Sequence, residues 1–197
     1  MFISFEGLDG CGKTTQAALL AEVARAAGRD VVSVREPGGT AAGERIRALL
    51  LDPETTVAPW TEALLYAAAR AELVAEVIRP ALDGGATVIA DRYVDSSLAY
   101  QGVARGLGWR EVLGVNLAAT GDLLPDRTVL LELAEDQAAA RRDGAPDRIE
   151  AEPGSFHASV ADGFATVARV FPDRVAVVDA AGDRDEVAAR VRAAVGL

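Results

Sequence analysis

Apolar segments of two kinds alternate along the chain. Short runs rich in valine and isoleucine, typical of buried strands, are separated by longer stretches whose apolar residues recur at helical spacing. Five runs are predicted to be strands, at residues 2–5, 31–34, 87–90, 128–133 and 175–178. This alternation is typical of an α/β fold, in which a five-stranded parallel sheet lies between two layers of flanking helices.

Helices are predicted over residues 13–27, 41–51, 61–82, 93–104, 109–119, 134–142, 155–170 and 184–195. The last of them starts after Asp183, which has the spacing of a capping box with Glu186. One stretch departs from the regular pattern. Residues 141–154, RRDGAPDRIEAEPG, are charged and contain two glycines and two prolines. Such a segment is too polar for a core, so we expect a mobile loop or lid in a single domain that spans 1–197.

Composition narrows the class of protein. The chain has 197 residues, half of them hydrophobic, which suits one compact domain with a sizeable core. Its net charge of −10 opposes binding to a nucleic acid polymer. No apolar run approaches the roughly 18 residues of a membrane span, and the acidic Glu6 near the N-terminus argues against a signal peptide. With Cys11 as its single cysteine, the chain is expected to be cytoplasmic and to bind no membrane.

The strongest motif follows the first predicted strand. Residues 7–14, GLDGCGKT, match the Walker A pattern and open the first predicted helix. Glycines let successive N–H groups point at phosphate oxygens, the Lys13 ammonium bridges the β- and γ-phosphates, and the Thr14 hydroxyl can ligate Mg²⁺. The context predicts a P-loop NTPase fold. The expected ATP site comprises Gly7, Asp9, Gly10, Cys11, Gly12, Lys13, Thr14 and Thr15.

The basic residues discriminate among P-loop proteins. Lys13 is the only lysine of the chain, and the other 19 basic residues are arginines. GTPases commonly recognise guanine with an Asn-Lys-x-Asp motif, which this chain lacks, so a GTPase switch is disfavoured. A kinase, an ATP-dependent ligase and a non-catalytic ATP-binding module stay open at this point. Cys11, near a helix N-terminus, is either a redox-sensitive thiol or a small residue tolerated in a tight turn.

Four stretches carry a family resemblance: FEGLDGCGKTTQ at 5–16, VREPGGTAAGERIRALLL at 34–51, EALLYAAARAELVAEVIRPA at 62–81 and IADRYVDSSLAYQGVARG at 89–106. Together they closely resemble the bacterial thymidylate kinases, which are P-loop nucleoside monophosphate kinases. The resemblance covers nearly the whole chain, and its DRYVDSSLAYQG block is highly specific. It implies transfer of the γ-phosphoryl of ATP to dTMP, giving dTDP for dTTP synthesis. Another small P-loop kinase, acting on a different nucleotide or nucleoside, is the alternative.

The resemblance also implies an acceptor site. Arg92 and Arg47 are expected to bind the dTMP phosphate, and Arg35 with Glu36 is expected to lie beside the acceptor. Asp91 is expected to hold Mg²⁺ together with Thr14. Tyr66, where the family commonly has phenylalanine, would stack on thymine, while Tyr100 would close the sugar pocket near C2′. The full expected set is Asp9, Arg35, Glu36, Arg47, Tyr66, Arg70, Arg92, Ser96, Ser97, Tyr100 and Gln101. Of these, Arg70 would donate to a base carbonyl and Asp9 would contact the 3′-hydroxyl or cap the helix.

Catalysis is expected to come from alignment and charge neutralisation, because the acceptor phosphate is already ionised near neutral pH. The sole histidine, His157, is therefore expected to be structural. No arginine occupies the variable positions of the phosphate loop, so the resemblance implies that residues 141–154 supply one. The expected catalytic residues are Lys13, Asp9, Arg92, Arg142 and Arg148, with Arg141 as a further candidate. Relatives form homodimers, which the resemblance extends to this chain.

Overall fold

The computed structural model describes residues 1–141 and 145–196. Its elements follow in the order β1 (Phe2–Glu6), α1 (Lys13–Ala26), β2 (Val31–Arg35), α2 (Ala41–Leu51), α3 (Pro59–Leu73), η1 (Val74–Ile78), α4 (Arg79–Asp83), β3 (Thr87–Asp91), α5 (Val94–Ser97), η2 (Leu98–Ala104), α6 (Trp109–Thr120), β4 (Arg127–Glu132), α7 (Glu135–Ala140), α8 (Gly154–Val170), β5 (Val175–Asp179) and α9 (Arg184–Val195), where η marks a π-helical segment. All five predicted strands are confirmed. The Asp183–Glu186 capping box at the start of α9 is also confirmed.

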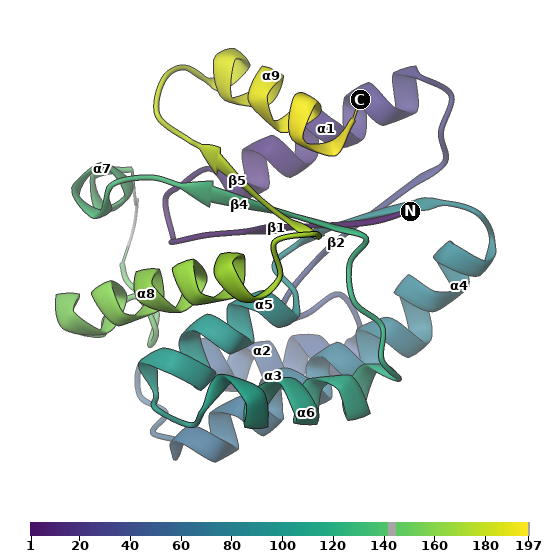
Figure 1. The fold of residues 1–197 in the computed structure, drawn as a ribbon. Coiled ribbons are helices and arrows are strands. Elements are labelled where there is room, and N and C mark those ends of the chain that lie inside the picture. The colour runs from purple at the N-terminus through teal and green to yellow at the C-terminus, as the bar shows by residue number, and fades with distance from the viewer. Residues whose placement is uncertain (142–144, 197) are drawn as a thin grey trace.

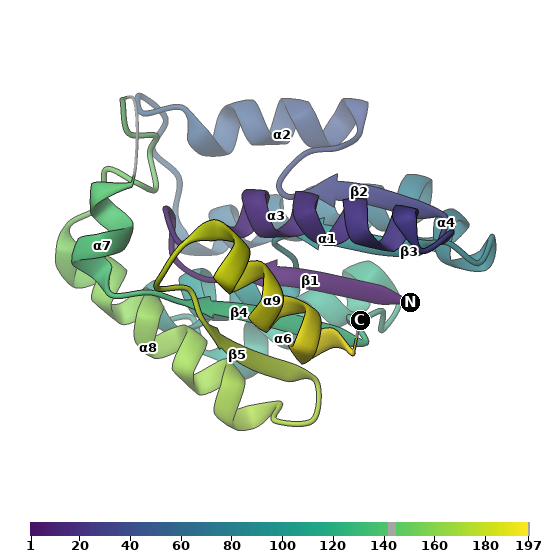
Figure 2. The same cartoon turned by 90° about the horizontal axis from the view of Figure 1, so that it is seen from above.

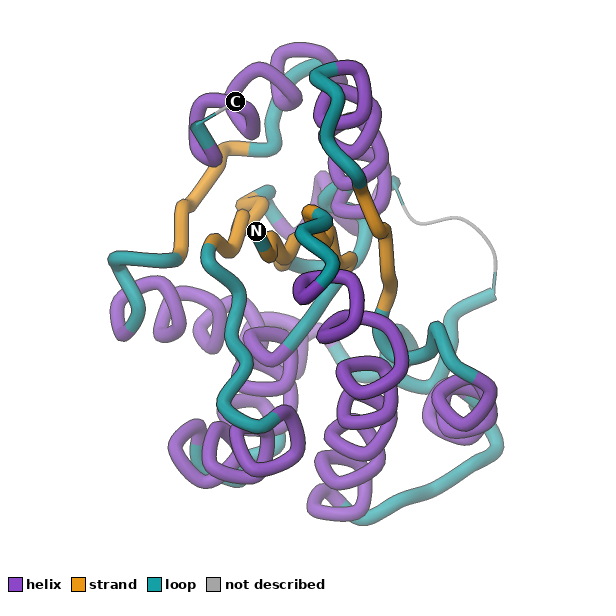
Figure 3. Tube along the Cα trace, turned by 90° about the vertical axis from the view of Figure 1, so that its right-hand side faces the viewer, coloured by secondary structure: helices purple, strands orange, loops and turns teal. Residues whose placement is uncertain are grey.

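The five strands form one parallel sheet in the order β2-β3-β1-β4-β5. Helices α1 and α9 cover one face, and α3, α5, α6 and α8 lie on the other, which gives the three predicted layers (Figure 1; Figure 3). Seen from above, α2 lies on the β2 side of the molecule, and α8 lies on the β5 side (Figure 2). After β1 the chain continues toward β2, whereas after β3 it crosses to β4, so the carboxyl ends of these two central strands meet at a topological switch point. Ligands of open α/β sheets bind at such a point.

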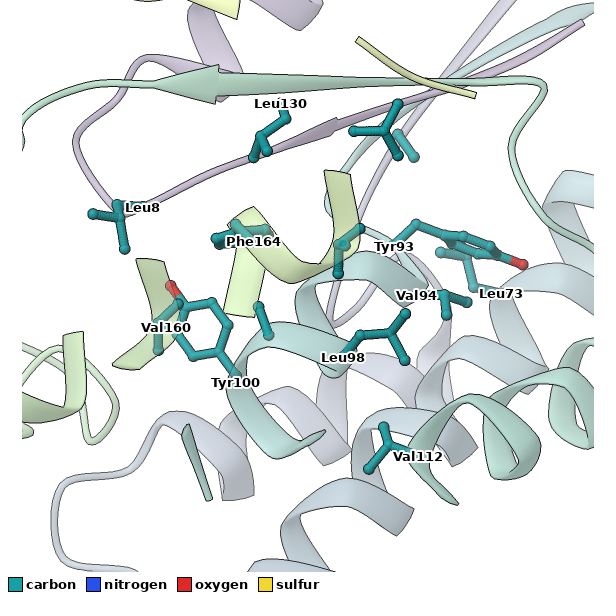
Figure 4. Packing of buried hydrophobic residues seen from close by; sticks show 14 of the residues in the cluster. Leu8, Leu73, Tyr93, Val94, Leu98, Tyr100, Val112, Leu130, Val160 and Phe164 are labelled. Carbon is teal, nitrogen blue, oxygen red and sulfur yellow. The ribbon is translucent and has the colours of Figure 1, made fainter. Parts of the chain in front are cut away.

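Each face of the sheet has its own apolar core. Ile3 and Phe5 of β1 pack toward α1 and α9 on one side. On the other side, the Tyr100 ring meets Phe164 edge-on, with 6.1 Å between the ring centroids (Figure 4). Gly163 is required there, since a Cβ at this position would lie 2.6 Å from the Ala99 Cα. The absence of a side chain thus lets α8 lie directly against η2.

Two predicted helices differ from regular α-helices. The helix expected over 61–82 consists of α3, η1 and α4 in succession, and that expected over 93–104 consists of α5 and η2. For the first, Pro80 supplies the reason. Its ring has no N–H and would clash with the carbonyl of residue 76 in a regular α-helix, so a π-helical turn before it accommodates the chain. Among the described helices, none combines the length and apolar character needed to cross a membrane.

The charged segment 141–154 is partly anchored. The expectation that it is too polar to pack was wrong for its second half, since Ile149 is buried in the core below the sheet. Asp147 Oδ1 accepts from the backbone N–H groups of Ile149 (2.8 Å) and Glu150 (2.9 Å), while Asp147 N donates to Glu150 Oε2 at 3.1 Å. These bonds make a capped turn over residues 147–152, which we call the anchored turn.

Candidate active site

A cavity of about 710 Å³ opens at the carboxyl ends of β1 and β3. Every residue predicted for the ATP site except Gly7 lines it. From the acceptor set, the lining residues are Asp9, Arg35, Glu36, Arg47, Tyr66, Arg92, Ser96, Ser97, Tyr100 and Gln101, joined by Asp91 from the predicted metal pair. The structure therefore brings most of both sets to one pocket, whereas Arg70 and Arg148 are not in its lining and Arg142 lies outside the described residues.

The phosphate loop depends on glycine geometry. Gly7, Gly10 and Gly12 have φ values of 134°, 89° and 97°, a region that other residues rarely adopt. At Gly10, a Cβ would also collide with the backbone carbonyl of Ala138. Gly12 is the N-cap of α1 and provides no side-chain cap, so the first N–H groups of that helix remain for phosphate oxygens.

The Lys13 ammonium lies at the centre of this loop. It is buried and donates to the carbonyl oxygens of Leu8 at 2.8 Å and Gly7 at 3.2 Å. Its Nζ is also 3.5 Å from Asp9 Oδ1. The neighbouring Cys11 is buried, and burial raises the pKa of its thiol. A protonated, enclosed thiol does not suit a redox role, so the small-residue interpretation is favoured.

Two side chains whose oxygens could ligate a metal ion lie next to each other near the phosphate loop. The Thr14 hydroxyl donates to Asp91 Oδ2 at 2.5 Å, and both residues line the cavity. Within the described residues, no group of three or more histidine, cysteine, aspartate or glutamate side chains forms a metal site. A pair of hard oxygen ligands suits Mg²⁺, which usually completes its coordination with substrate phosphates and water.

Asp9, Arg92 and Tyr100 form a cluster between the two ends of the cavity. Arg92 has a left-handed φ of 73°, and its guanidinium pairs with Asp9 Oδ1 and donates to Ser96 Oγ at 2.9 Å. The Tyr100 hydroxyl donates to Asp9 Oδ2 at 3.2 Å. Burial by itself raises the pKa of Asp9, but the charges of Arg92 and Lys13 outweigh it and hold that pKa far below its usual range. Asp9 is therefore an anion that fixes Arg92.

Two further arginines from the expected acceptor set, Arg35 and Arg47, line the cavity. Arg47 Nη1 donates to the Pro37 carbonyl at 3.0 Å, and Arg35 Nη2 forms an ion pair with Glu44 at 3.0 Å. Burial and the nearby Arg35 charge lower the pKa of Arg47. Two guanidinium groups that repel each other across a pocket favour an anion between them, and each can bind a phosphate in bidentate fashion.

Tyr66 and Arg70 of α3 have different surroundings. Tyr66 lines the cavity, and burial raises the pKa of its phenol, which therefore stays neutral. Arg70 is fully buried, and its guanidinium donates to Glu36 Oε2 (2.8 Å), Ser97 Oγ (3.1 Å), the Tyr93 carbonyl (3.1 Å) and Asn116 Oδ1. The structure thus places Arg70 behind the pocket wall, where it fixes Glu36 and Ser97. Its contact with the base stays a prediction.

The arginines of segment 141–154 are also separated. Arg141 lines the cavity. Arg148 does not, because its Nη1 donates to Glu62 Oε2 at 2.8 Å and its Nε donates to the Leu50 carbonyl at 2.7 Å. Among the described residues of this segment, Arg141 is accordingly the arginine that lines the cavity.

One group of residues that line the cavity was not predicted from the sequence. Ala180, Gly182, Asp183, Arg184 and Val187, from the β5–α9 loop and the start of α9, line it beside Gln16. The Gln16 Nε2 donates to the Arg184 carbonyl at 3.0 Å and ties α1 to this loop. The position of these residues directly after the last predicted strand could have indicated them, since loops at the carboxyl edge of a parallel sheet commonly bind ligands.

Glu6, at the end of β1, was considered only as a sign against a signal peptide. Its buried carboxylate accepts from the Tyr93 backbone N–H at 2.7 Å and from the Ser96 hydroxyl at 2.5 Å. Because Ser96 Oγ also accepts a hydrogen bond from Arg92, Glu6 helps to fix the position of Arg92 through Ser96. Burial and the charge of Asp95 raise the pKa of Glu6 to about 8. An acidic residue at the end of a fully buried strand was the signal in the sequence.

A phosphate loop facing an arginine-lined pocket across one cavity defines a P-loop kinase that acts on an already phosphorylated nucleotide. The family model described as thymidylate kinase matches residues 5–191, and the chain belongs to the thymidylate kinase family. It is 50% identical to the thymidylate kinase of Deinococcus radiodurans over 99% of this chain and 96% of that protein. It is also 50% identical to that of Caldanaerobacter subterraneus subsp. tengcongensis over 90% of this chain and 86% of that protein.

A solved thymidylate kinase from Ehrlichia chaffeensis has the same fold. It matches with a TM-score of 0.81 and 33% identity, over 99% of this chain and 98% of that one. The predicted fold, family and activity are thereby confirmed: the chain is a nucleoside monophosphate kinase that phosphorylates dTMP to dTDP, with ATP as the phosphoryl donor.

Proposed function

We propose that ATP and dTMP bind end to end in the cavity, with their phosphates meeting between Lys13 and Arg92. The observation that carries this arrangement is a single cavity lined by the phosphate loop in one part and by Arg47, Tyr66 and Arg92 in another. The adenine end of ATP then lies beside Gln16 and the β5–α9 loop. Residues 141–154 act as the lid, and Arg141, which lines the cavity, is the described arginine of this segment placed to reach the transferring phosphoryl group.

At the acceptor end, the charges match a nucleoside monophosphate. Arg35, Arg47 and Arg92 bind the phosphate dianion, and Tyr66 stacks on the base. Ser96, Ser97 and Gln101 surround the nucleoside, with Glu36 on the Arg70 side. Tyr100, held by Asp9, leaves little room at C2′ and so favours deoxyribose. No proton has to be abstracted from the acceptor phosphate, and catalysis consists of alignment together with charge neutralisation by Lys13 and the arginines.

We place Mg²⁺ at Thr14 and Asp91. Their oxygens are hard ligands, they are adjacent, and both face the cavity beside the phosphate loop. The ion would supply positive charge to the oxygens of the donor phosphates. Thr14 and Asp91 would hold its position from the protein side, with Asp91 acting directly or through water.

A panel of acceptors tests this function directly. The reaction with ATP and Mg²⁺ is measured by the release of ADP. Among dTMP, dUMP, UMP, CMP, AMP and thymidine, dTMP is expected to give the highest kcat/KM. UMP should be at least about tenfold poorer than dUMP, because its 2′-hydroxyl meets Tyr100. Thymidine should be inactive, because it leaves the three arginines without their anion. Preference for AMP or thymidine would refute the assignment.

A homodimer is proposed from the surface of α2 and α3. Trp60 and Leu64 are one helical turn apart on α3 and are 41% and 52% exposed, and Leu49 of the adjoining α2 is 43% exposed. Large apolar side chains on neighbouring helices are typical of a protein interface. Light scattering should give twice the monomer mass for the native chain and the monomer mass for the Trp60→Glu, Leu64→Glu variant. A monomeric native chain would contradict the proposal.

A further inference from the structure

Glu62 is the centre of a buried network outside the pocket lining. It lies in the first turn of α3 with 1% of its surface exposed. Its carboxylate accepts from Gln101 Nε2 (2.9 Å), from Arg105 Nε (3.2 Å) and Nη2 (3.1 Å), and from Arg148 Nη1 (2.8 Å). These contacts hold the pKa of Glu62 below its usual range, although burial opposes them. One carboxylate therefore joins α3, η2 and the anchored turn.

The anchored turn is held at both ends through this carboxylate. At its start, Arg148 donates from its backbone N–H to the Leu51 carbonyl (3.2 Å) and from Nε to the Leu50 carbonyl (2.7 Å), in addition to its bond to Glu62. At its end, Arg105 pairs with Glu152 at 2.6 Å. Two of the three guanidinium nitrogens of Arg148 donate to buried oxygens, and the third, Nη2, is buried and has no hydrogen-bond partner among the described residues.

The anchored turn forms part of the acceptor wall. Asp147, Ile149 and Glu150 line the cavity together with Arg47 and Tyr66. The charge of Asp147 acts on both Arg47 and Tyr66, which places it near the expected position of the acceptor nucleotide. Tyr66 is itself one helical turn after Glu62 on α3. The wall and the stacking residue are thus tied to the same buried carboxylate.

We propose that Arg148 and Glu62 are positioning residues for the acceptor nucleotide, because their ion pair fixes the anchored turn against α3. Arg148 in this account does not touch the transferring phosphoryl group, in contrast to the role expected from the sequence. The proposal rests on the proposed function, since it assigns a wall to the dTMP end of the cavity. Removing Arg148 leaves Arg105 as the cationic partner of the buried Glu62 carboxylate, and removing the Glu62 charge leaves Arg148 without its anionic partner among the described residues. Because both changes break the same ion pair, the two substitutions should not be additive.

The test compares Arg148→Met, Glu62→Gln and the double variant. Each single variant is expected to raise the KM for dTMP about tenfold and to keep kcat within about threefold of the native value. The double variant should be no worse than the poorer single variant. Glu54→Gln is the control, because Glu54 is an exposed glutamate outside the anchored turn and does not line the cavity. It should retain the native KM.

Hydrogen exchange supplies a readout that does not depend on turnover. The amides of Ile149 and Glu150, which are bonded to Asp147, should exchange faster in both single variants, while the amides of β1 stay unchanged. A drop in kcat of tenfold or more in Arg148→Met with an unchanged KM for dTMP, together with native kinetics in Glu62→Gln, would overturn the proposal and return Arg148 to the reacting group. Failure of the proposed function would look different, since the native chain would then prefer another acceptor.

Discussion

Replacing Lys13 by alanine is expected to lower kcat by about 100- to 1,000-fold, the usual effect of removing one preorganised group that neutralises charge in a transition state. The ammonium is enclosed by the loop proposed to bind the donor phosphates, and its contacts with the Gly7 and Leu8 carbonyls hold it there. Since Lys13 is the only lysine of the chain, no other lysine can take over its role. Arginine is too wide to fit the same position and should not restore activity.

The measurement is steady-state turnover with saturating ATP and dTMP, combined with calorimetric titration of dTMP. The dissociation constant of dTMP should change by less than about threefold, because the acceptor end of the cavity is intact. Arg25→Ala is the matched control, since it removes one positive charge from the exposed side of the same helix. If Lys13→Ala kept kcat within threefold of the native value, the assignment of the phosphate loop as the donor site would be wrong.

The features that could be predicted from sequence patterns are those that depend on residues close together in the chain. The strands at 2–5 and 87–90 and the loop at 7–14 follow from apolar runs and from glycine positions within a few residues of each other. The same holds for the Asp183–Glu186 capping box. The family resemblance added the acceptor residues, and the cavity gathers most of them.

What the sequence did not predict concerns residues whose partners are distant in sequence. The catalytic role that the resemblance implies for Arg148 stays a prediction, and nothing in the sequence indicated that its guanidinium is held by Glu62, 86 residues earlier. Ile149 was taken for part of a polar loop, although it is buried in the core. Glu6 had no assigned role, because its structural role depends on hydrogen bonds from Ser96 and Tyr93. These two residues lie next to Glu6 only because β1 pairs with β3.

Together these buried contacts make the acceptor end rigid before any substrate arrives. Arg92 is fixed by Asp9 and by Ser96, and Ser96 is in turn fixed by Glu6. Arg70 holds Glu36 and Ser97 in the same way on the other side of the wall. Preorganised charges avoid reorganisation during phosphoryl transfer, so a part of the stability of the fold serves the orientation of these groups.

Glu6 should make the stability of the protein fall as the pH rises from 4.5 to about 8. Its pKa rises from an ordinary value of 4.5 to about 8 in the folded chain, so the folded state binds a proton that the unfolded state has lost between these values. The stabilising contribution is complete below pH 4.5 and declines as the pH rises through 8. At about 1.4 kcal/mol for each pKa unit, the decline has a ceiling of about 5 kcal/mol.

Glu6→Gln removes this titration while keeping an oxygen for the Tyr93 N–H. Urea unfolding should therefore show the variant gaining stability over the native chain, by about 3 kcal/mol between pH 6 and pH 9, because about two of the pKa units of the shift lie in this window. Glu132→Gln is the control, since Glu132 ends the neighbouring strand β4 in an exposed position. That control should follow the native chain at every pH. A constant difference between Glu6→Gln and the native chain over this range would show that the Glu6 carboxylate titrates normally, and that its burial does not disfavour the charged form.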